Sequence, residues 1–327
     1  MDHRRRFTVA LWATVLLFAG LSQASGTPSV RPLVWTTLGT DSGPFIKTDR
    51  SQPANMMLVN GKPWLIDCGA GTVERLAATG HQAAQVDVVF LSHVHIDHIA
   101  GLEGLIGLRW MGGAHTAITI YGPPGTDVVV AGLLQSMKPA SLIVNSASDV
   151  QNPPPDALVK VVIVRDGSDL TVDGVRVRAM RNTHFDKPPG HSLNPSTESL
   201  SYRFDKDGYS VGYTGDTGPS DAVAKLEQGA DLLISEVIDL PSIIADAEAR
   251  QPNMTASEKA TLTTHLITQH LTPEEAGRIA TAAHIRRLVF THLAIVGPTN
   301  MIAPRLIAGA RTTFGGEVEV AHDLDTF

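Results

Sequence analysis

The chain has 327 residues, a formal net charge of −7 and a hydrophobic content of 43%. This length suits one large α/β domain preceded by a short leader, and an acidic chain is a poor general binder of polyanions. Cys68 is the one cysteine, so no intramolecular disulfide can form and stability must come from the core and from any bound metal.

The first 24 residues have the features of a secretory signal. Three consecutive arginines precede an uncharged apolar run, and Ser22-Gln23-Ala24 ends the segment with small residues that suit a signal peptidase. The apolar run is shorter than the about 20 residues that span a bilayer, which argues against a stable membrane anchor. We therefore expect a leader at 1–24, a single domain at 25–327 and a periplasmic or secreted protein, exported by the general or the twin-arginine route.

Short strands separated by turns lead to the stretch that is richest in chemistry. Asn60-Gly61 between two apolar runs is typical of a hairpin turn. Asp67 begins a run of small residues, and it is either a turn aspartate or a residue that orients a metal-binding loop. The run 86–91 is predicted as a buried strand because it is rich in β-branched residues.

Four polar side chains follow that strand within six residues: His93, His95, Asp97 and His98. Packing gives no reason to place three imidazoles and a carboxylate together, because each polar group would need a partner. Imidazole and carboxylate are ligands that zinc, iron and manganese accept. The side chains fan out around a small volume, which suits two metal ions better than one.

Three further candidate ligands each follow an apolar run that is predicted to be a strand. Residues 175–180 lead to His184, residues 209–213 lead to Asp216, and residues 288–290 lead to His292. Each of them alone is weak support for a metal site. Their order along the chain, His, Asp and His after the first motif, makes the three together stronger support for a metal site.

The motif His-x-His-x-Asp-His after a strand resembles that of the metallo-β-lactamase superfamily of metallohydrolases. The resemblance implies an α/β fold of the αββα sandwich type and two zinc ions, with iron or manganese possible. It assigns one metal to His93, His95 and His184, the other to Asp97, His98 and His292, and the bridge to Asp216.

The segment from Asp231 to His292 resembles the branch that contains ribonuclease Z, bacterial arylsulfatases and related phosphodiesterases. In that branch a histidine supported by a glutamate lies beside the metals, which assigns these roles to His270 and Glu236. Thr272-Pro273 predicts a helix start directly after His270. Helices at 241–250, 256–266 and 273–283 are expected to form an insertion over the site.

The main hypothesis is a secreted dinuclear zinc hydrolase of a phosphodiester or an aryl sulfate ester. A hydroxide that bridges the metals attacks the ester, Asp97 orients it, and His270, polarised by Glu236, protonates the leaving oxygen or holds the anionic group. The alternatives are a lactone or lactam hydrolase of the same superfamily, a ribonuclease Z-like endoribonuclease, and a metal-binding homologue without catalysis.

Substrate size is inferred from a segment that is absent. Arm-bearing ribonuclease Z proteins carry an arm for transfer RNA between the ligand histidine and the bridging aspartate, and residues 185–215 leave no room for it. With the acidic charge and the predicted export, this indicates a small anionic ester as substrate, and we do not expect nucleic acid as a partner. A homodimer is possible.

Other polar residues have weaker assignments. Asn182 and His191 are candidates for the rim of the site. Residues 145–155, rich in Ser, Asn and Pro, are predicted to form a surface loop. Five other histidines are predicted to be surface or packing residues: His81, His115, His265, His284 and His322.

Overall fold

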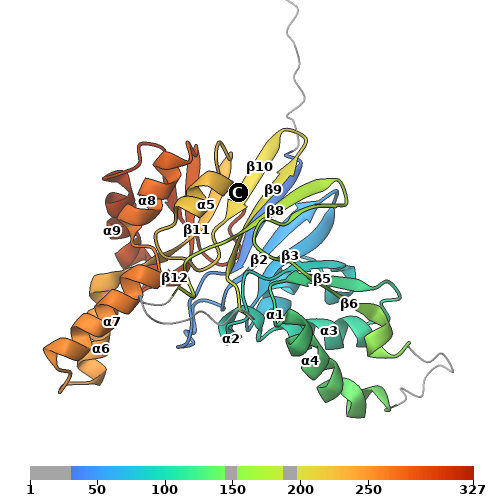
Figure 1. Cartoon of the computed structure of the whole chain (residues 1–327). Coiled ribbons are helices and arrows are strands. Elements are labelled where there is room, and N and C mark those ends of the chain that lie inside the picture. Colours follow the sequence, from blue (N-terminus) through green and yellow to red (C-terminus); the bar gives the residue numbers. More distant parts are fainter. Residues whose placement is uncertain (1–30, 144–152, 187–196) are drawn as a thin grey trace, which may run out of the picture. The chain divides into compact units, whose positions relative to one another are not determined.

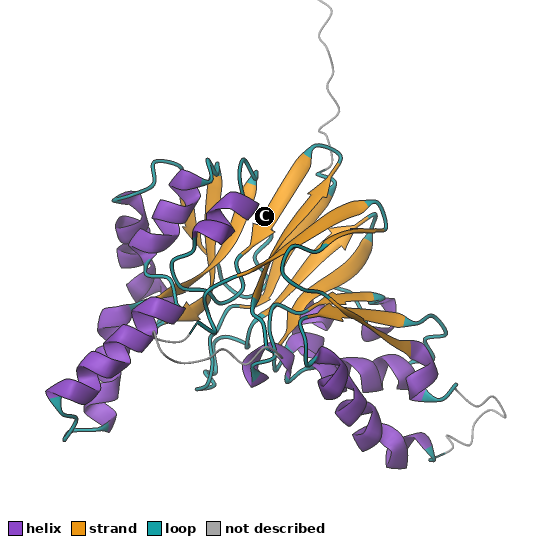
Figure 2. Ribbon diagram, in the orientation of Figure 1, coloured by secondary structure: helices purple, strands orange, loops and turns teal. Residues whose placement is uncertain are grey.

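Two β-sheets pack face to face, and helices cover the outer side of each sheet (Figure 1, Figure 2). The computed structural model describes residues 31–143, 153–186 and 197–327. Residues 32–327 form one compact unit. This arrangement confirms the predicted αββα sandwich.

The first sheet has the strand order β1-β2-β3-β4-β5-β6. Its strands are β1 Leu33–Gly39, β2 Ala54–Val59, β3 Lys62–Cys68, β4 Val88–Phe90, β5 Ile118–Gly122 and β6 Val159–Ile163. The pairs from β1 to β3 are antiparallel, and the pairs from β3 to β6 are parallel. Asn60 and Gly61 turn between β2 and β3 with φ values of 51° and 78°, which is the left-handed geometry that this dipeptide favours in hairpins.

The second sheet has the order β13-β12-β11-β10-β9-β8-β7. Its strands are β7 Asp169–Val172, β8 Val175–Arg181, β9 Leu200–Lys206, β10 Tyr209–Tyr213, β11 Leu232–Ile238, β12 Arg287–Ala294 and β13 Glu317–Val320. The pairs from β7 to β10 are antiparallel and those from β10 to β13 are parallel. Both sheets therefore join an antiparallel meander to a parallel half.

The helices of the described residues are α1 Thr72–Ala78, α2 Ile96–Ile99, α3 Leu102–Met111, α4 Thr126–Ser141, α5 Asp221–Leu226, α6 Leu240–Arg250, α7 Ala256–Gln269, α8 Pro273–Ala282 and α9 Thr299–Arg311. Short 3-10 turns occur at Ala83–Gln85 and Pro155–Leu158. Within the described ranges, no helix is both long and apolar enough to cross a membrane.

Aromatic side chains fill the space between the sheets. Phe90 stacks on Tyr121 with ring centroids 4.6 Å apart, and it meets the edges of Tyr202 and Phe204 at 5.5 Å. Each sheet has one further apolar cluster, which lies between the sheet and its outer helices. These three cores hold the strand ends that carry the site in fixed positions.

Three details differ from the predictions. The strand before the metal motif is shorter than expected, Val88–Phe90. The helix α9 and the strand β13 were not predicted. Helix α8 is not part of an insertion, because Ala276, Ile279 and Ala280 are buried against the second sheet, whereas α6 and α7 form a separate hairpin with no buried residue (Figure 1).

The leader at 1–24 and most of the loop predicted at 145–155 lie outside the described residues. Both stay predictions.

Candidate metal centre

The seven predicted ligands come from separate segments that end at one edge of the sandwich. His93 and His95 lie in the loop after β4, and Asp97 and His98 lie in the short helix α2. The other three belong to the second sheet: His184 follows β8, Asp216 follows β10 and His292 lies within β12. The structure thus brings together all seven positions.

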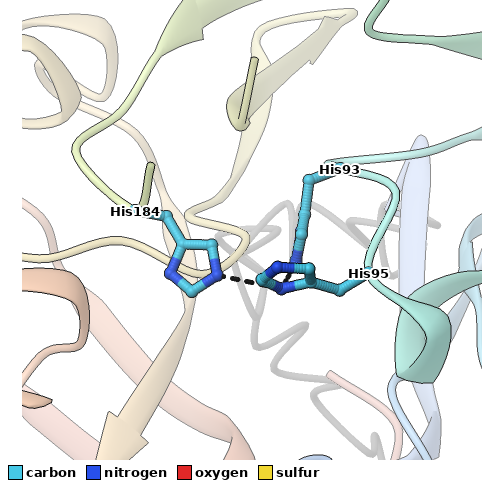
Figure 3. Close-up of side chains that lie close together, drawn as sticks. All are labelled: His93, His95 and His184. Carbon is cyan, nitrogen blue, oxygen red and sulfur yellow. Dashed lines mark hydrogen bonds between the residues drawn. The ribbon is translucent and has the colours of Figure 1, made fainter. Parts of the chain in front are cut away.

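His93, His95 and His184 form the first cluster. The Nε2 atom of His93 lies 3.0 Å from Nδ1 of His95, and Nε2 of His184 lies 3.2 Å from the same Nδ1. Figure 3 shows the ring of His184 facing the rings of the other two. Nitrogens converging from three rings are a donor set that fits a transition-metal ion.

Asp97, His98, Asp216 and His292 form the second cluster. Nε2 of His98 lies 3.3 Å from Oδ1 of Asp216, and Nε2 of His292 lies 3.2 Å from Oδ2. Asp97 Oδ2 is 3.7 Å from both imidazole Nε2 atoms. Both Nε2 atoms and Asp216 Oδ1 are buried without a hydrogen-bond partner in the described part of the chain, which is costly unless a metal ion satisfies them.

Asp216 lies between the two clusters. Its Oδ2 atom is 3.9 Å from His93 Nε2 and 3.8 Å from His184 Nε2, while Oδ1 faces His98. One carboxylate therefore faces both donor sets, as a bridging ligand must. The residues present fit two metal ions.

The two clusters differ in their proton affinity. Burial lowers the pKa of His184 to about 3 and that of His93 well below its usual value. Burial also opposes the charging of His98, but the carboxylates of Asp216 and Asp67 outweigh it and raise the pKa of His98 to about 10. The first cluster is therefore made of neutral imidazoles, whereas a metal at the second replaces protons.

Asp67 orients His98 and the loop after β4. Its Oδ2 accepts hydrogen bonds from His98 Nδ1 at 2.8 Å, Tyr213 Oη at 2.7 Å and Ser92 Oγ at 2.8 Å. Its Oδ1 accepts the Ser92 N–H at 2.7 Å. Of the two roles considered for Asp67, the contacts favour the orienting one.

Asp97 is fixed by the backbone of Gly43, whose N–H donates to Asp97 Oδ2 at 2.8 Å. A Cβ atom at position 43 would lie 2.6 Å from that oxygen, so a glycine is required for this close approach. His184 is fixed in turn, because its Nδ1 lies 3.0 Å from the Gln269 carbonyl oxygen and donates to it.

His270 and Glu236 form a hydrogen-bonded pair beside the clusters. His270 Nδ1 donates to Glu236 Oε2 at 2.7 Å, and the backbone N–H of Thr217 donates to Glu236 Oε1. Glu236 is buried in β11, and His270 ends helix α7. The ring of His270 lies 5.0 Å from that of His184. Burial lowers the pKa of His270, but the Glu236 carboxylate outweighs it and raises the pKa.

A cavity of about 790 Å³ opens over the clusters, and the residues lining it include His95, Asp97, His184, Asp216, His270 and His292. Phe185, Gln269 and His265 line it as well. The surface or packing role predicted for His265 is therefore incomplete, because the structure places it in the cavity wall. Phe185 was missed although it adjoins His184, because its ring contacts with His93 and His95 depend on the tertiary fold.

The two rim candidates have different outcomes. Asn182 is buried below the cavity, where it donates to the Thr214 carbonyl at 3.1 Å and accepts the His184 N–H at 3.2 Å. Because it is buried, Asn182 is not a rim residue. Its amide instead completes the backbone hydrogen bonds around His184. His191 lies outside the described residues.

Similar proteins were found at three levels. A family model described as a β-lactamase superfamily domain matches residues 64–293. Ribonuclease Z of Mycobacterium bovis is 31% identical over 294 residues, which are 88% of this chain and 95% of that protein. The metallo-β-lactamase fold protein YhfI from Bacillus subtilis is 25% identical with a TM-score of 0.65, covering 90% of this chain and 99% of that chain.

A solved structure of the short form of human tRNase Z has a TM-score of 0.59 at 21% identity, and it covers 90% of this chain and 98% of that chain. This likeness is one of fold. The matches overturn one expectation from the sequence, that nucleic acid is not a partner, because ribonuclease Z proteins match along almost the whole chain. The acidic net charge is a property of the whole chain, and the short segment 185–215 limits only the room for an arm. Neither feature decides which ester the metal site accepts.

Proposed function

We propose that this chain, which belongs to the β-lactamase superfamily of metallohydrolases and within it to the ribonuclease Z family, cleaves a phosphodiester bond of RNA. The two memberships confirm the resemblance inferred from the sequence motifs. The choice of RNA over a small ester is supported by the similarity to ribonuclease Z along the chain. The His270–Glu236 pair beside the clusters carries the mechanistic part of the proposal.

In this proposal His93, His95 and His184 would hold one ion, Asp97, His98 and His292 would hold the other, and Asp216 would serve both. Zinc is the expected metal because three imidazoles make a typical zinc donor set, although iron and manganese accept the same groups. Two dications would supply Lewis acidity toward the phosphate and lower the pKa of water.

The protein's own groups would position the reactants. Asp97, held by the Gly43 N–H, is placed to accept a hydrogen bond from the attacking water. Glu236 occupies Nδ1 of His270, which leaves Nε2 for the substrate. The Glu236 carboxylate raises the pKa of His270 and so favours its protonated form, from which His270 can donate a proton to the leaving oxygen as the phosphodiester bond breaks.

The test compares leaving groups. A ribose alkoxide needs a proton as it leaves, whereas p-nitrophenolate does not. The variant His270→Ala is therefore expected to lower kcat on a single-stranded RNA by about 100-fold or more, with a much smaller loss on bis(p-nitrophenyl) phosphate. Asp97→Ala should abolish both activities. His115→Ala, a change at an exposed histidine, is the matched control.

Each part of the proposal fails on a separate outcome. A metal-loaded wild-type protein that hydrolyses p-nitrophenyl sulfate but no phosphodiester contradicts the assigned reaction. Equal losses on both leaving groups in His270→Ala contradict the general-acid role and leave His270 as a group that holds the anion.

A further inference from the structure

A second cavity adjoins the catalytic one. Its volume is about 480 Å³, and Val94 and Thr197 stand in the walls of both cavities. The remaining wall comes from the start of α4 and the end of β6, where Pro124, Val128 and Ile163 contribute apolar surface. A volume of this size falls within the range of about 300–1,000 Å³ that is usual for small-molecule sites.

Apolar side chains connect the two cavities. Ile96, which lines the catalytic cavity, is 73% exposed, and Val128 and Ile163 in the second cavity are 71% and 38% exposed. Val94 stands in the walls of both cavities, and its side chain lies 3.9 Å from the point that a Cβ atom on Gly125 would occupy. We call Val94, Ile96, Val128 and Ile163 the apolar strip. Apolar side chains gathered on a surface beside an active site are typical of a binding surface.

Three basic side chains on the described segments around these cavities are paired with carboxylates. Lys47 lies 2.7 Å from Asp41, Arg165 lies 3.0 Å from Glu198, and Arg181 contacts Asp186. With a net charge of −7 on the whole chain, phosphates beyond the scissile one would find little compensating charge. A strand held here must be held mainly through its bases.

We propose that the apolar strip and the second cavity form a subsite for a nucleobase next to the scissile phosphate, an inference that rests on the proposed RNA cleavage. A base that is turned out of its stack can pack between aromatic or apolar side chains. The base packs against Val94 and Val128 with Ile163 behind it, while Asp127 in the same wall offers a carboxylate to its edge. The site thereby selects an unpaired nucleotide at the cleavage position.

The test measures KM and kcat on a short RNA with an unpaired 3′ extension. Val128→Asn and, separately, Ile163→Asn should raise KM about 10-fold with little change in kcat, because each change removes apolar surface that the base buries. Leu142→Asn, at an 81% exposed residue at the other end of α4, is the matched control. Hydrolysis of bis(p-nitrophenyl) phosphate should be unchanged in all three variants.

A second arm removes the base instead of the side chain. A series of RNAs carries one abasic nucleotide each, at successive positions around the cleavage site. At one position the missing base should raise the KM of the wild-type protein. With that RNA, Val128→Asn should raise the KM no further. The slope of log KM against log salt concentration is about 0.7 for each phosphate contacted on a single strand. We expect a slope that corresponds to one or two phosphates.

The outcomes separate the two claims. Unchanged KM in folded Val128→Asn and Ile163→Asn, or additive losses at every abasic position, overturn the subsite while RNA cleavage stands. A salt slope equivalent to several phosphates overturns recognition through the base. A wild-type protein that hydrolyses bis(p-nitrophenyl) phosphate but no RNA overturns the proposed function itself.

Discussion

Asp67 holds His98 by a hydrogen bond of 2.8 Å from the imidazole Nδ1, so that Nε2 points at Asp216. The same aspartate has a φ of 59°, a left-handed conformation that is strained for a residue with a side chain. His292, on the other side of the second cluster, has a φ of 42°. Two non-glycine residues thus keep unfavourable backbone geometry where the metal donors meet, and the contacts of Asp67 with Ser92, Tyr213 and His98 offset its cost.

The substitution Asp67→Asn should weaken metal binding more than it weakens the fold. The introduced amide would no longer offer a charged acceptor to His98 Nδ1, and loss of such a partner typically lowers metal affinity about 10–100-fold. Competition with a chromogenic chelator measures the affinity. The control is Asp231→Asn. Asp231 directly precedes β11 and its carboxylate accepts hydrogen bonds from Ser210, so its loss should leave the metal affinity unchanged. Equal affinity in folded Asp67→Asn would remove the orienting role.

Glu227 makes stability depend on pH. Its carboxyl is buried without a hydrogen-bond partner in the described part of the chain, and this burial raises its pKa to about 8 from a usual 4.5, although the Arg203 guanidinium opposes the shift. The folded state therefore binds a proton that the unfolded state has released. Its stabilising contribution is complete below about pH 4.5, falls as pH rises through about 8 and is level above that.

The variant Glu227→Gln should flatten this dependence. The free energy of unfolding, measured with denaturant at pH 5, 6.5 and 8, is expected to fall with pH in the wild type by at most about 1.4 kcal/mol per unit from this group. The slope should be smaller in Glu227→Gln and unchanged in Glu317→Gln, a change at a 65% exposed side chain. Identical slopes in Glu227→Gln and wild type would show that Glu227 is ionised in the fold.

Phe90 anchors the core between the two sheets, and it immediately precedes the segment that carries the metal ligands. It is fully buried among Trp64, Tyr121, Tyr202 and Phe204. Phe90→Ala should lower the free energy of unfolding by about 3–5 kcal/mol because a large cavity forms. Met301→Ala, at a 74% exposed residue, should change it by less than about 0.5 kcal/mol. A loss below about 1 kcal/mol in Phe90→Ala would mean that the sheets repack.

We also propose that residues 1–24 direct export and are removed. The amino-terminal sequence of the protein recovered from outside the cytoplasm of a bacterial host is then expected to begin at Ser25. Lysine substitution of the three consecutive arginines retains the positive charge and would slow twin-arginine export more than general secretion. An intact Met1 on cytoplasmic protein would contradict both routes.

The sequence could predict the ligands because they lie at the ends of apolar runs that form neighbouring strands. That logic works for His93, His184 and Asp216, since strand ends of a sheet meet at one edge. It does not place His265 in the cavity wall, because only the tertiary fold shows that α7 turns this face toward the cavity. It also fails for α8, whose apolar side chains Ala276 and Ile279 fit an outer layer as well as an insertion.

The second cavity was also beyond prediction from sequence. Val94, Val128 and Ile163 come from three segments, and each alone is an ordinary apolar residue. Their meeting depends on the register of β5 between β4 and β6. Local patterns fix the strands and the donors, whereas the shape of a surface depends on packing between segments that are distant in sequence.

Metal titration of RNA cleavage tests the central claim most directly. Protein stripped with a chelator and dialysed is supplied with increasing zinc, and the bound metal and the rate of cleavage of a single-stranded RNA are measured on the same samples. We predict no cleavage without metal, a rate that rises until two ions are bound per chain, and no recovery in Asp97→Ala. Full cleavage by the stripped protein, or none by a protein that holds two ions, would contradict the proposed dinuclear RNA cleavage.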